Sequence, residues 1–418
     1  MSIFKKFQPI ASAFAPNYTF WDCLIAGKYL LPWNWNKLQK GKNYRKLERK
    51  FCEYMQSRWA TSFDSGRSGF YAILKCLEIK DYDEIILQAF TTVALPNAIQ
   101  WCGAKPVFVD IKENTLNIDS TKIEKKITDK TRAIVVQHTF GNPVEIDEIM
   151  AIAKKHNLYI IEDCAHSLGA EYKGKKTGIF GDVAFFSFGR DKVISSVAGG
   201  MVVTNNNELG EKIKRFRDQM PYTDKSLIVR QLLHPIITFK ALKIYYFFSI
   251  GKMMMLVINK LMILPKAYTR QEKNSEKSKN FPAQMSNSLA EIALHQMKLV
   301  GEFNNHRIKI ANLYKDYLEN NSKVILPETI PESKNIFLWY TVLVENKKEL
   351  IEKAQRNHII LGDWFPQVIG PAEVDLKKSE YIEGSCPIAE NISSKCINLP
   401  THHNISRKDV KKVVMIFE

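Results

Sequence analysis

The feature that most constrains the fold is a regular alternation of short apolar runs and helical segments in the first half of the chain. Each run holds three or four consecutive apolar residues, without the polar alternation of a half-exposed strand. Strands that are buried on both faces have this pattern, and the intervening helices supply the covering layers. We therefore predict an α/β domain with a mostly parallel sheet in a three-layer α/β/α arrangement. The predicted strands are 83–90, 105–111, 132–141, 158–167, 181–189 and 199–206.

The chain of 418 residues is long for one hydrophobic core, so more than one domain is expected. We divide it into an N-terminal extension (1–42), a large domain (43–225), an insert (226–275), and linking helices with a small α+β domain (276–418). Within the last part, 286–320 has the spacing of long amphipathic helices, and mixed strands and helices follow.

The insert differs in composition from the rest of the chain. Between 225 and 271 it contains eight Lys or Arg residues and no Asp or Glu, next to long apolar stretches. Lysines interrupt these stretches too often for a membrane-spanning helix, and Pro235 and Gly251 are expected to divide them into two short helices. Two interpretations stay open. Residues 232–265 form either a hairpin in an anionic membrane interface or a subunit interface or lid.

The overall charge is strongly positive, with 60 Lys and Arg against 44 Asp and Glu. This balance favours nucleic acid, an anionic membrane or phosphate-bearing substrates as partners. Zinc-finger spacing and arginine-rich blocks are both missing from the sequence, so we expect no nucleic-acid partner. The seven cysteines form no C-x-x-C pair, and the N-terminus lacks the apolar core of a signal peptide. We therefore predict a cytoplasmic protein without a metal site or a disulfide framework.

One candidate site motif is a carboxylate at the end of a strand. "YIIEDCAHS" places Asp163 at the carboxyl end of a predicted parallel strand, where α/β folds bind ligands, and His166 follows three residues later. A poorly solvated carboxylate in that place needs a cation or a protonated nitrogen as its partner. The alternative is that Asp163 only caps the following turn.

Two further motifs add a phosphate seat and a nucleophile. In "SFDSGRSG", a Ser/Gly loop opens a helix whose N–H groups suit a phosphate, and Gly66 leaves room for it, although such turns are common. In "SFGRDK", Ser187 precedes Lys192, whose amine is nucleophilic where burial or the nearby Arg190 lowers its pKa. Asp191 would act in the opposite direction, so Lys192 by itself has the features of an ordinary surface lysine.

The three motifs together are the parts that a pyridoxal phosphate enzyme needs. Their order and spacing resemble the DegT/StrS family of pyridoxal-phosphate-dependent sugar aminotransferases, which have the fold of aspartate aminotransferase (fold type I). The resemblance runs from about Tyr44 to the end, apart from the insert. It rests on "DSGRSGFYAIL", "CGAKPVFVDIKENTLNID", "IIEDCAHSLGAEYKGKKTGIFGDVAFFSFGRDK", "GGMVVT" and "INLPTHHNIS".

The resemblance implies a role for each motif. Lys192 would bond the aldehyde of the cofactor and act as acid and base, Asp163 would pair with the pyridine nitrogen, and His166 would approach the phenolic side of the ring. The phosphate would be held by Gly66, Arg67 and Ser187. The resemblance also implies a homodimer whose sites take residues from both subunits.

The implied reaction moves an amino group from an amino acid, glutamate, to a nucleotide-linked keto-sugar for surface polysaccharide or glycan synthesis. The alternatives are a pyridoxal-phosphate-dependent sugar dehydratase or lyase, and a non-catalytic membrane-associated protein that keeps the fold. Relatives that dehydrate carry His at the position of Lys192, so the lysine favours amino transfer.

Two departures from the family pattern lie at positions implied to contact the cofactor or substrate. The family has an aromatic residue stacked on the cofactor ring where this chain has Thr92. In "NFPAQMSN", Pro282 and Gln284 replace the Asn and Arg that reach across the subunit interface in the family. Arg67, where the family often has Thr, could add a cation at the phosphate.

Overall fold

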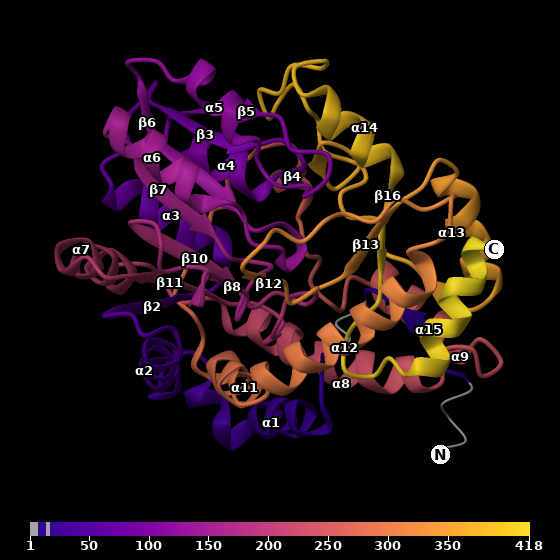
Figure 1. The fold of residues 1–418 in the computed structure, drawn as a ribbon. Helices are drawn as coiled ribbons and strands as arrows, with labels where there is room; N and C mark the ends of the chain where they lie inside the picture. The colour runs from indigo at the N-terminus through magenta and orange to yellow at the C-terminus, as the bar shows by residue number, and fades with distance from the viewer. Residues whose placement is uncertain (1–6, 14–16) are drawn as a thin grey trace.

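A seven-stranded sheet forms the centre of the computed structural model, which describes residues 7–13 and 17–418. The strand order is β2-β11-β10-β7-β6-β3-β5, and β11 alone in this sheet runs antiparallel to its neighbours (Figure 1). The strands are β2 (Trp59–Phe63), β3 (Glu84–Gln88), β5 (Lys105–Val109), β6 (Thr131–Gln137), β7 (Tyr159–Asp163), β10 (Val183–Ser187) and β11 (Gly200–Thr204).

Both faces of this sheet are buried, which explains why its strands are continuously apolar. In β3, Ile85 and Leu87 belong to one core cluster and Ile86 to another on the opposite face. The helix α6 (Ile146–His156) covers the Ile86 face, whereas α3 (Gly66–Cys76) and α4 (Ala94–Trp101) cover the Ile85 face. The predicted three-layer α/β/α domain is confirmed.

The C-terminal part has a core of its own. The strands β13 (Tyr340–Leu343) and β16 (Cys396–Leu399) pair antiparallel, and α12 (Val300–Leu318) and α15 (Arg407–Val414) pack against them. This agrees with the predicted small α+β domain. The other helices here are α13 (Lys347–Arg356) and α14 (Pro387–Lys395).

The remaining elements connect these parts. The strand β1 (Ile10–Ala11) pairs with β14 (Ile359–Ile360), so the N-terminal segment is tied to the small domain. The other strands are β4 (Thr91–Thr92), β8 (Glu171–Tyr172), β9 (Lys175–Lys176), β12 (Ser333–Lys334) and β15 (Ile369–Gly370). The other helices outside the insert include α1 (Phe20–Leu30), η2 (Pro32–Lys37), α2 (Asn43–Met55), α5 (Ser120–Ile123), α7 (Asn207–Asp218) and α11 (Asn287–Met297), with the short 3-10 turns η3 (Glu124–Lys126), η4 (Thr139–Gly141) and η5 (Met415–Phe417).

The insert forms two helices, but they do not divide where the sequence predicted. The helix α8 (Lys225–Lys243) continues through Pro235, and the chain turns only after Lys243, before α9 (Ile250–Lys260). The expectation that Pro235 ends a helix is therefore wrong. Pro235 is buried in the face of α8 next to Leu232 and Thr238, and this packing offsets the lost hydrogen bond.

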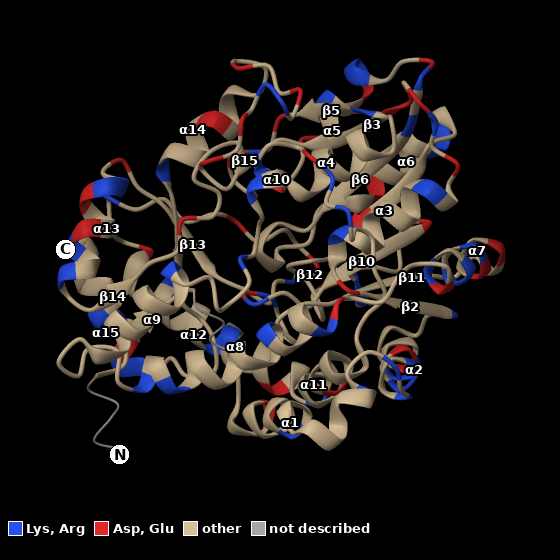
Figure 2. Ribbon diagram, turned by 180° about the vertical axis from the view of Figure 1, so that it is seen from behind, with Lys and Arg blue, Asp and Glu red and all other residues tan. Residues whose placement is uncertain are grey.

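Gly251 also differs from its predicted role as a helix breaker, because it lies inside α9. A Cβ at this position would be 2.3 Å from the carbonyl oxygen of Ala241 in α8, so glycine lets the two helices approach closely. Among the helices of the described residues, none is long and apolar enough to span a bilayer. Both views of the molecule place α1, α8 and α9 toward its lower edge (Figures 1 and 2).

Candidate active site

The candidate site lies at the carboxyl edge of the central sheet, where Asp163 ends β7. Its carboxylate is buried, and Oδ1 accepts a hydrogen bond from the backbone N–H of Ala165 at 2.9 Å. Asp163 therefore does cap the following turn, as one interpretation of the sequence proposed. Burial raises the pKa of Asp163 to about 6, and within the described ranges no cation lies at ion-pair distance from it. A protonated nitrogen would compensate this buried carboxylate.

Lys192 and His166 are brought into direct contact. The Nζ of Lys192 lies 2.8 Å from the Nε2 of His166. Burial lowers the pKa of Lys192 to about 8, against the attraction of Asp163. Burial and the charge of Lys192 hold the pKa of His166 well below its usual value, so its imidazole is neutral. Nε2 accepts from the lysine, which leaves the proton on a buried Nδ1 without a partner.

The first turn of α3 meets the end of β10 and forms the candidate phosphate seat. The Ser65 hydroxyl caps the helix by accepting from the N–H of Ser68 at 3.2 Å. A Cβ on Gly66 would lie 3.1 Å from the Cβ of Ser187, so the helix start and the serine are adjacent. A Cβ on Gly200 would lie 2.5 Å from the backbone nitrogen of Gly66, so only glycine permits this approach. Unpaired N–H groups in the first helical turn suit a phosphate.

Arg67 and Thr92 lie on the outer side of this edge, and both contact the last part of the insert. The guanidinium of Arg67 pairs with Glu272 and lies over the ring of Tyr268, 5.3 Å from its centroid. The Thr92 hydroxyl bonds to the hydroxyl of Tyr268. The backbone of Arg67 thus belongs to the phosphate seat, whereas its side chain is engaged by Glu272.

Two residues that the sequence did not single out support the loop between β10 and β11 (188–199), which carries Lys192 and which we call the lysine loop. The Nδ2 of Asn17 donates to the carbonyl oxygen of Lys192 at 2.6 Å. Arg307 in α12 donates to the carbonyl oxygen of Val193 at 2.8 Å and to Oδ1 of Asn17 at 3.2 Å. Arg307 is 1% exposed, and burial lowers its pKa to about 9. Neither residue lies in a recognisable motif, and an amphipathic helix pattern does not distinguish a buried arginine from an exposed one.

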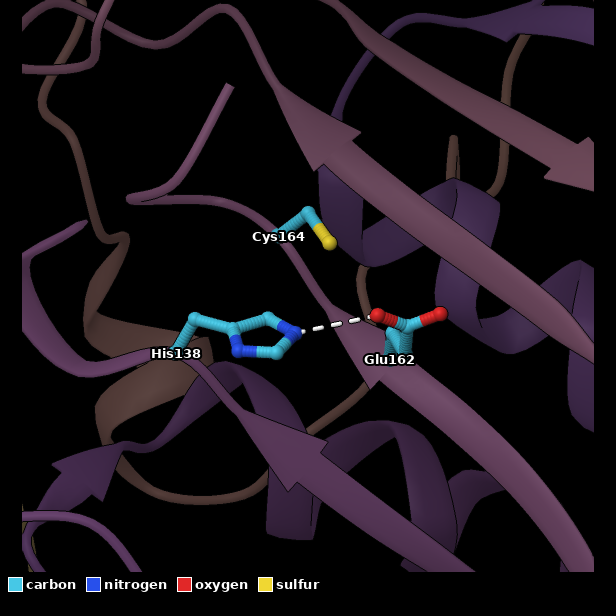
Figure 3. Close-up of side chains that lie close together, drawn as sticks. All are labelled: His138, Glu162 and Cys164. Carbon is cyan, nitrogen blue, oxygen red and sulfur yellow. Dashed lines mark hydrogen bonds and ion pairs between the residues drawn. The ribbon is translucent and has the colours of Figure 1, made fainter. Parts of the chain in front are cut away.

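His138, Glu162 and Cys164 form a separate buried cluster (Figure 3). Their potential ligand atoms lie within 4.8 Å of one another, which is close enough to hold a metal ion. The Glu162 carboxylate already accepts bonds from the N–H groups of three residues, Gly178, Phe180 and Gly181. The Nδ1 of His138 accepts from a backbone N–H, so its Nε2 carries the proton and donates to Glu162 at 3.1 Å. His138 and Glu162 thus have hydrogen-bond partners within the protein, and we assign the cluster a structural role.

These groups fit pyridoxal phosphate. Asp163 is a buried carboxylate suited to a protonated ring nitrogen, and the pKa of the nearby Lys192 is lowered, as an amine that bonds an aldehyde requires. The seat brings the first turn of α3 next to Ser187, because the glycines at 66 and 200 let the helix start approach β10 and β11 closely, and it offers a phosphate the N–H groups of that turn and the serine hydroxyl. The orphaned Nδ1 of His166 is a further buried polar atom available to a ligand.

Comparisons with known proteins agree with this geometry. The model of the DegT/DnrJ/EryC1/StrS aminotransferase family matches residues 31–227 and 259–418. GDP-perosamine synthase of Escherichia coli O157:H7 is 31% identical over 379 residues, covering 89% of this chain and 88% of the relative. A transaminase of Aneurinibacillus thermoaerophilus, named dTDP-3-amino-3,6-dideoxy-alpha-D-galactopyranose transaminase, is 28% identical and covers 88% of this chain and 87% of its own.

Solved structures share the fold. The aminotransferase PseC of Helicobacter pylori superposes with a TM-score of 0.74 at 23% identity, covering 98% of this chain and 97% of its own. An aminotransferase of Psychrobacter cryohalolentis gives a TM-score of 0.74 at 24% identity and covers 96% of each chain. The chain is an aminotransferase that belongs to the DegT/DnrJ/EryC1/StrS family.

Proposed function

We propose that this enzyme moves an amino group from glutamate to a keto-sugar that is carried on a nucleotide, for surface polysaccharide or glycan synthesis. It is a pyridoxal-phosphate-dependent sugar-nucleotide aminotransferase, in agreement with relatives named as GDP-perosamine synthase and as a dTDP-sugar transaminase. The positive overall charge suits a diphosphate-bearing substrate. The observation that carries the assignment is the contact of Lys192 with His166 beside the buried Asp163.

Each of these residues has a proposed task. Bound pyridoxal phosphate draws electrons away from the carbon that carries the amino group. The Nζ of Lys192 accepts and returns the proton that moves during amino transfer, and a pKa of about 8 allows both protonation states near neutral pH. Asp163 keeps a proton on the ring nitrogen, and neutral His166 orients Nζ through the 2.8 Å contact. Ser187, Gly66 and the backbone of Arg67 hold the phosphate.

The central test replaces the lysine. The purified protein is expected to show the visible absorbance of lysine-bound cofactor and to aminate a member of a panel of keto-sugar nucleotides with glutamate, as detected by mass spectrometry. Lys192→Ala is expected to abolish both the absorbance band and the product. A colourless protein that cannot be reconstituted with pyridoxal phosphate would overturn the proposal. Loss of oxygen from the sugar without gain of nitrogen would instead support a dehydratase.

We further propose that the insert contacts an anionic membrane surface at the cytoplasmic face, through residues 232–265. The family match leaves out 228–258, so most of the two helices of the insert lies outside the matched residues. Phe248 is 85% exposed, and the apolar residues Met253, Leu256 and Leu261 of α9 and its end are more than half exposed. Lysines flank them without a single acidic residue between 225 and 271. Exposed apolar side chains next to unopposed lysines are typical of an interfacial helix.

Exposed tryptophans of the N-terminal segment are a second argument for membrane contact. Trp21 of α1 is 63% exposed, and Trp33 of η2 is 71% exposed. The helix α1 packs against α8, and α8 packs against α9, so the helices that carry or adjoin these tryptophans are connected to α9 through α8. Tryptophan prefers the boundary between lipid and water.

Flotation with vesicles tests this proposal. The structure argues against deleting 232–265 as a whole, because α8 supports α1. Replacing Met253, Leu256 and Leu261 together by Ser is expected to abolish co-flotation with vesicles that contain anionic lipid, whereas the wild type floats. The matched control replaces Tyr82 and Ile382, which are exposed elsewhere, and is expected to float. Full-length protein that never floats would contradict the proposal.

We also propose that the enzyme is a homodimer. Light scattering after gel filtration is expected to give twice the 48.2 kDa chain mass. If the triple serine variant becomes monomeric and the wild type does not float, the exposed face of α9 is a subunit interface.

A further inference from the structure

The last part of the insert lies against the outer side of the candidate site. We call residues 262–275 the crossing segment; it includes α10 (Arg270–Lys273). Its carbonyl groups accept bonds from site residues: Pro265 from Arg190, and Ala267 from Arg67 at 3.5 Å. Farther along, the carbonyl oxygen of Glu272 accepts from Asn97 of α4 at 2.7 Å. These contacts hold the crossing segment against the loops that surround the cofactor seat.

Tyr268 is the residue of this segment that contacts both Arg67 and Thr92. Its ring lies under the guanidinium of Arg67, in the first turn of α3, and its hydroxyl bonds to Thr92, which follows β3. The backbone of Arg67 belongs to the phosphate seat, its guanidinium lies on the outer side of the seat, and Thr92 lies at the carboxyl edge of the sheet. The half-buried ring of Tyr268 therefore lies between the Arg67 side chain, beside the phosphate seat, and the edge of the sheet that carries Asp163.

We propose that Tyr268 is a cofactor-binding residue whose ring packs against the flat ring of pyridoxal phosphate. This inference rests on the cofactor site proposed above. A planar heterocycle gains from an aromatic neighbour on its face, and Thr92 offers only a hydroxyl in this region. The bond between the two hydroxyls gives Thr92 a different task, which is to fix the orientation of the Tyr268 ring. The crossing segment thus supplies the aromatic surface that the loop after β3 does not.

The test measures cofactor affinity rather than turnover. Apoenzyme is titrated with pyridoxal phosphate, and the visible absorbance and circular dichroism of the bound cofactor are recorded. Tyr268→Leu keeps an apolar side chain but removes the ring, and it is expected to weaken cofactor binding about tenfold and to change the visible circular dichroism. Tyr268→Phe keeps the ring and loses the hydroxyl bond, so it is expected to weaken binding only about threefold.

A rescue experiment separates ring packing from a merely structural role. Thr92→Phe is combined with Tyr268→Leu, which returns an aromatic ring to this part of the site from the other side chain of the pair. The double variant is expected to recover most of the lost affinity. Lys273→Ala serves as the control, because it breaks the ion pair of the crossing segment with Glu373 at 3.1 Å and leaves Tyr268 in place. This control is expected to bind the cofactor like the wild type.

Different results would overturn the role of Tyr268 and the cofactor site itself. If wild-type apoenzyme binds pyridoxal phosphate through Lys192 and Tyr268→Leu binds it equally well, Tyr268 has no such role. If Tyr268→Leu and Lys273→Ala weaken binding equally and Thr92→Phe rescues nothing, the segment acts only by its position, and the inference is also overturned. If Lys192→Ala and the wild type show the same spectrum, the cofactor site is wrong and the inference is lost with it.

Discussion

Burial sets the protonation of the three residues at the centre of the candidate site. Desolvation is the largest cause in each case: it raises the pKa of Asp163 to about 6, lowers that of Lys192 to about 8, and keeps His166 neutral. The attraction between Asp163 and Lys192 opposes both shifts and is the smaller effect. The site therefore favours a lysine that loses its proton readily beside a carboxylate that lacks a full counter-charge.

The lowered pKa of Lys192 predicts how the apoenzyme takes up its cofactor as the pH changes. Only the neutral amine attacks an aldehyde, and its fraction grows as the pH rises through about 8. The rate of reconstitution with pyridoxal phosphate, followed by visible absorbance, is expected to rise between about pH 7 and pH 9 and then level off. A midpoint near the ordinary lysine value of about 10.4 would contradict this burial effect.

Removing the charge of Asp163 is expected to lower turnover strongly while the fold is largely kept. Asp163→Asn keeps an oxygen for the N–H of Ala165 and fits the same buried space. A neutral amide does not hold a proton on the ring nitrogen, so the rate of amino transfer is expected to fall about a hundredfold or more. Steady-state kinetics measure the change, and Asp163→Glu is the control that keeps the charge. Equal activity of Asp163→Asn and the wild type would remove the carboxylate from the mechanism.

At the scale of elements, the phosphate seat depends on the close meeting of α3, β10 and β11. Ser187 of β10 pairs with Gly200 of β11, and Gly200 pairs with Phe63 at the end of β2. The backbone of Gly200 thereby passes directly beneath the start of α3. The position of the helix N-terminus, and with it the seat, follows from the absence of a side chain at this one strand position.

Gly200→Ala is expected to weaken both folding and cofactor binding. The added Cβ would lie 2.5 Å from the nitrogen of Gly66, so α3 must shift, at a cost of about 1–3 kcal/mol in the free energy of unfolding. Gly301→Ala in α12 is the matched control, because nothing lies within 4 Å of its added Cβ. Urea unfolding and cofactor titration of both variants measure the effects. A Gly200→Ala protein as stable and as tightly bound to cofactor as the control would show that the seat tolerates movement.

The sequence predicted elements and motifs whose signal is local. The apolar runs identified the buried strands, and the end of one run predicted the place of Asp163, whereas the joint role of Asp163, Ser187 and Lys192 came from the three motifs taken together and from the family resemblance. The course of α8 through Pro235 was not predictable, because it depends on packing against α1, some 200 residues away in the chain. Tyr268 likewise reaches Thr92 only through the path of the insert.

At the scale of the whole molecule, the N-terminal segment links the small domain to the lysine loop. The Ser12 hydroxyl donates to the carbonyl oxygen of Asn398 at 2.7 Å, and Trp339 Nε1 donates to the carbonyl oxygen of Ser12 at 3.0 Å. Asn17 then bonds to the carbonyl oxygen of Lys192 and to Arg307. A segment outside the sheet thus positions the backbone of the residue that is proposed to carry the cofactor.

Two substitutions at Asn17 distinguish the effect of its bond to the Lys192 carbonyl oxygen from the effect of its bond to Arg307. Asn17→Ala removes the donor to the Lys192 carbonyl oxygen and the acceptor for buried Arg307, and it is expected to cost about 1–3 kcal/mol in unfolding free energy. Asn17→Asp restores an acceptor, with charge, for Arg307 but no donor for the carbonyl. Stability is therefore expected to recover in Asn17→Asp, whereas the rate of amino transfer stays low.

The control for this link is Ser12→Ala, which loses the bond to Asn398 but leaves every contact of the lysine loop in place. It is expected to lower the unfolding free energy by about 1 kcal/mol without changing kcat. The cofactor absorbance of all three variants is expected to persist, because none of them removes the Lys192 amine. If Asn17→Asp regains full turnover together with stability, the bond from Asn17 to the Lys192 carbonyl oxygen has no part in catalysis, and the N-terminal segment supports the fold alone.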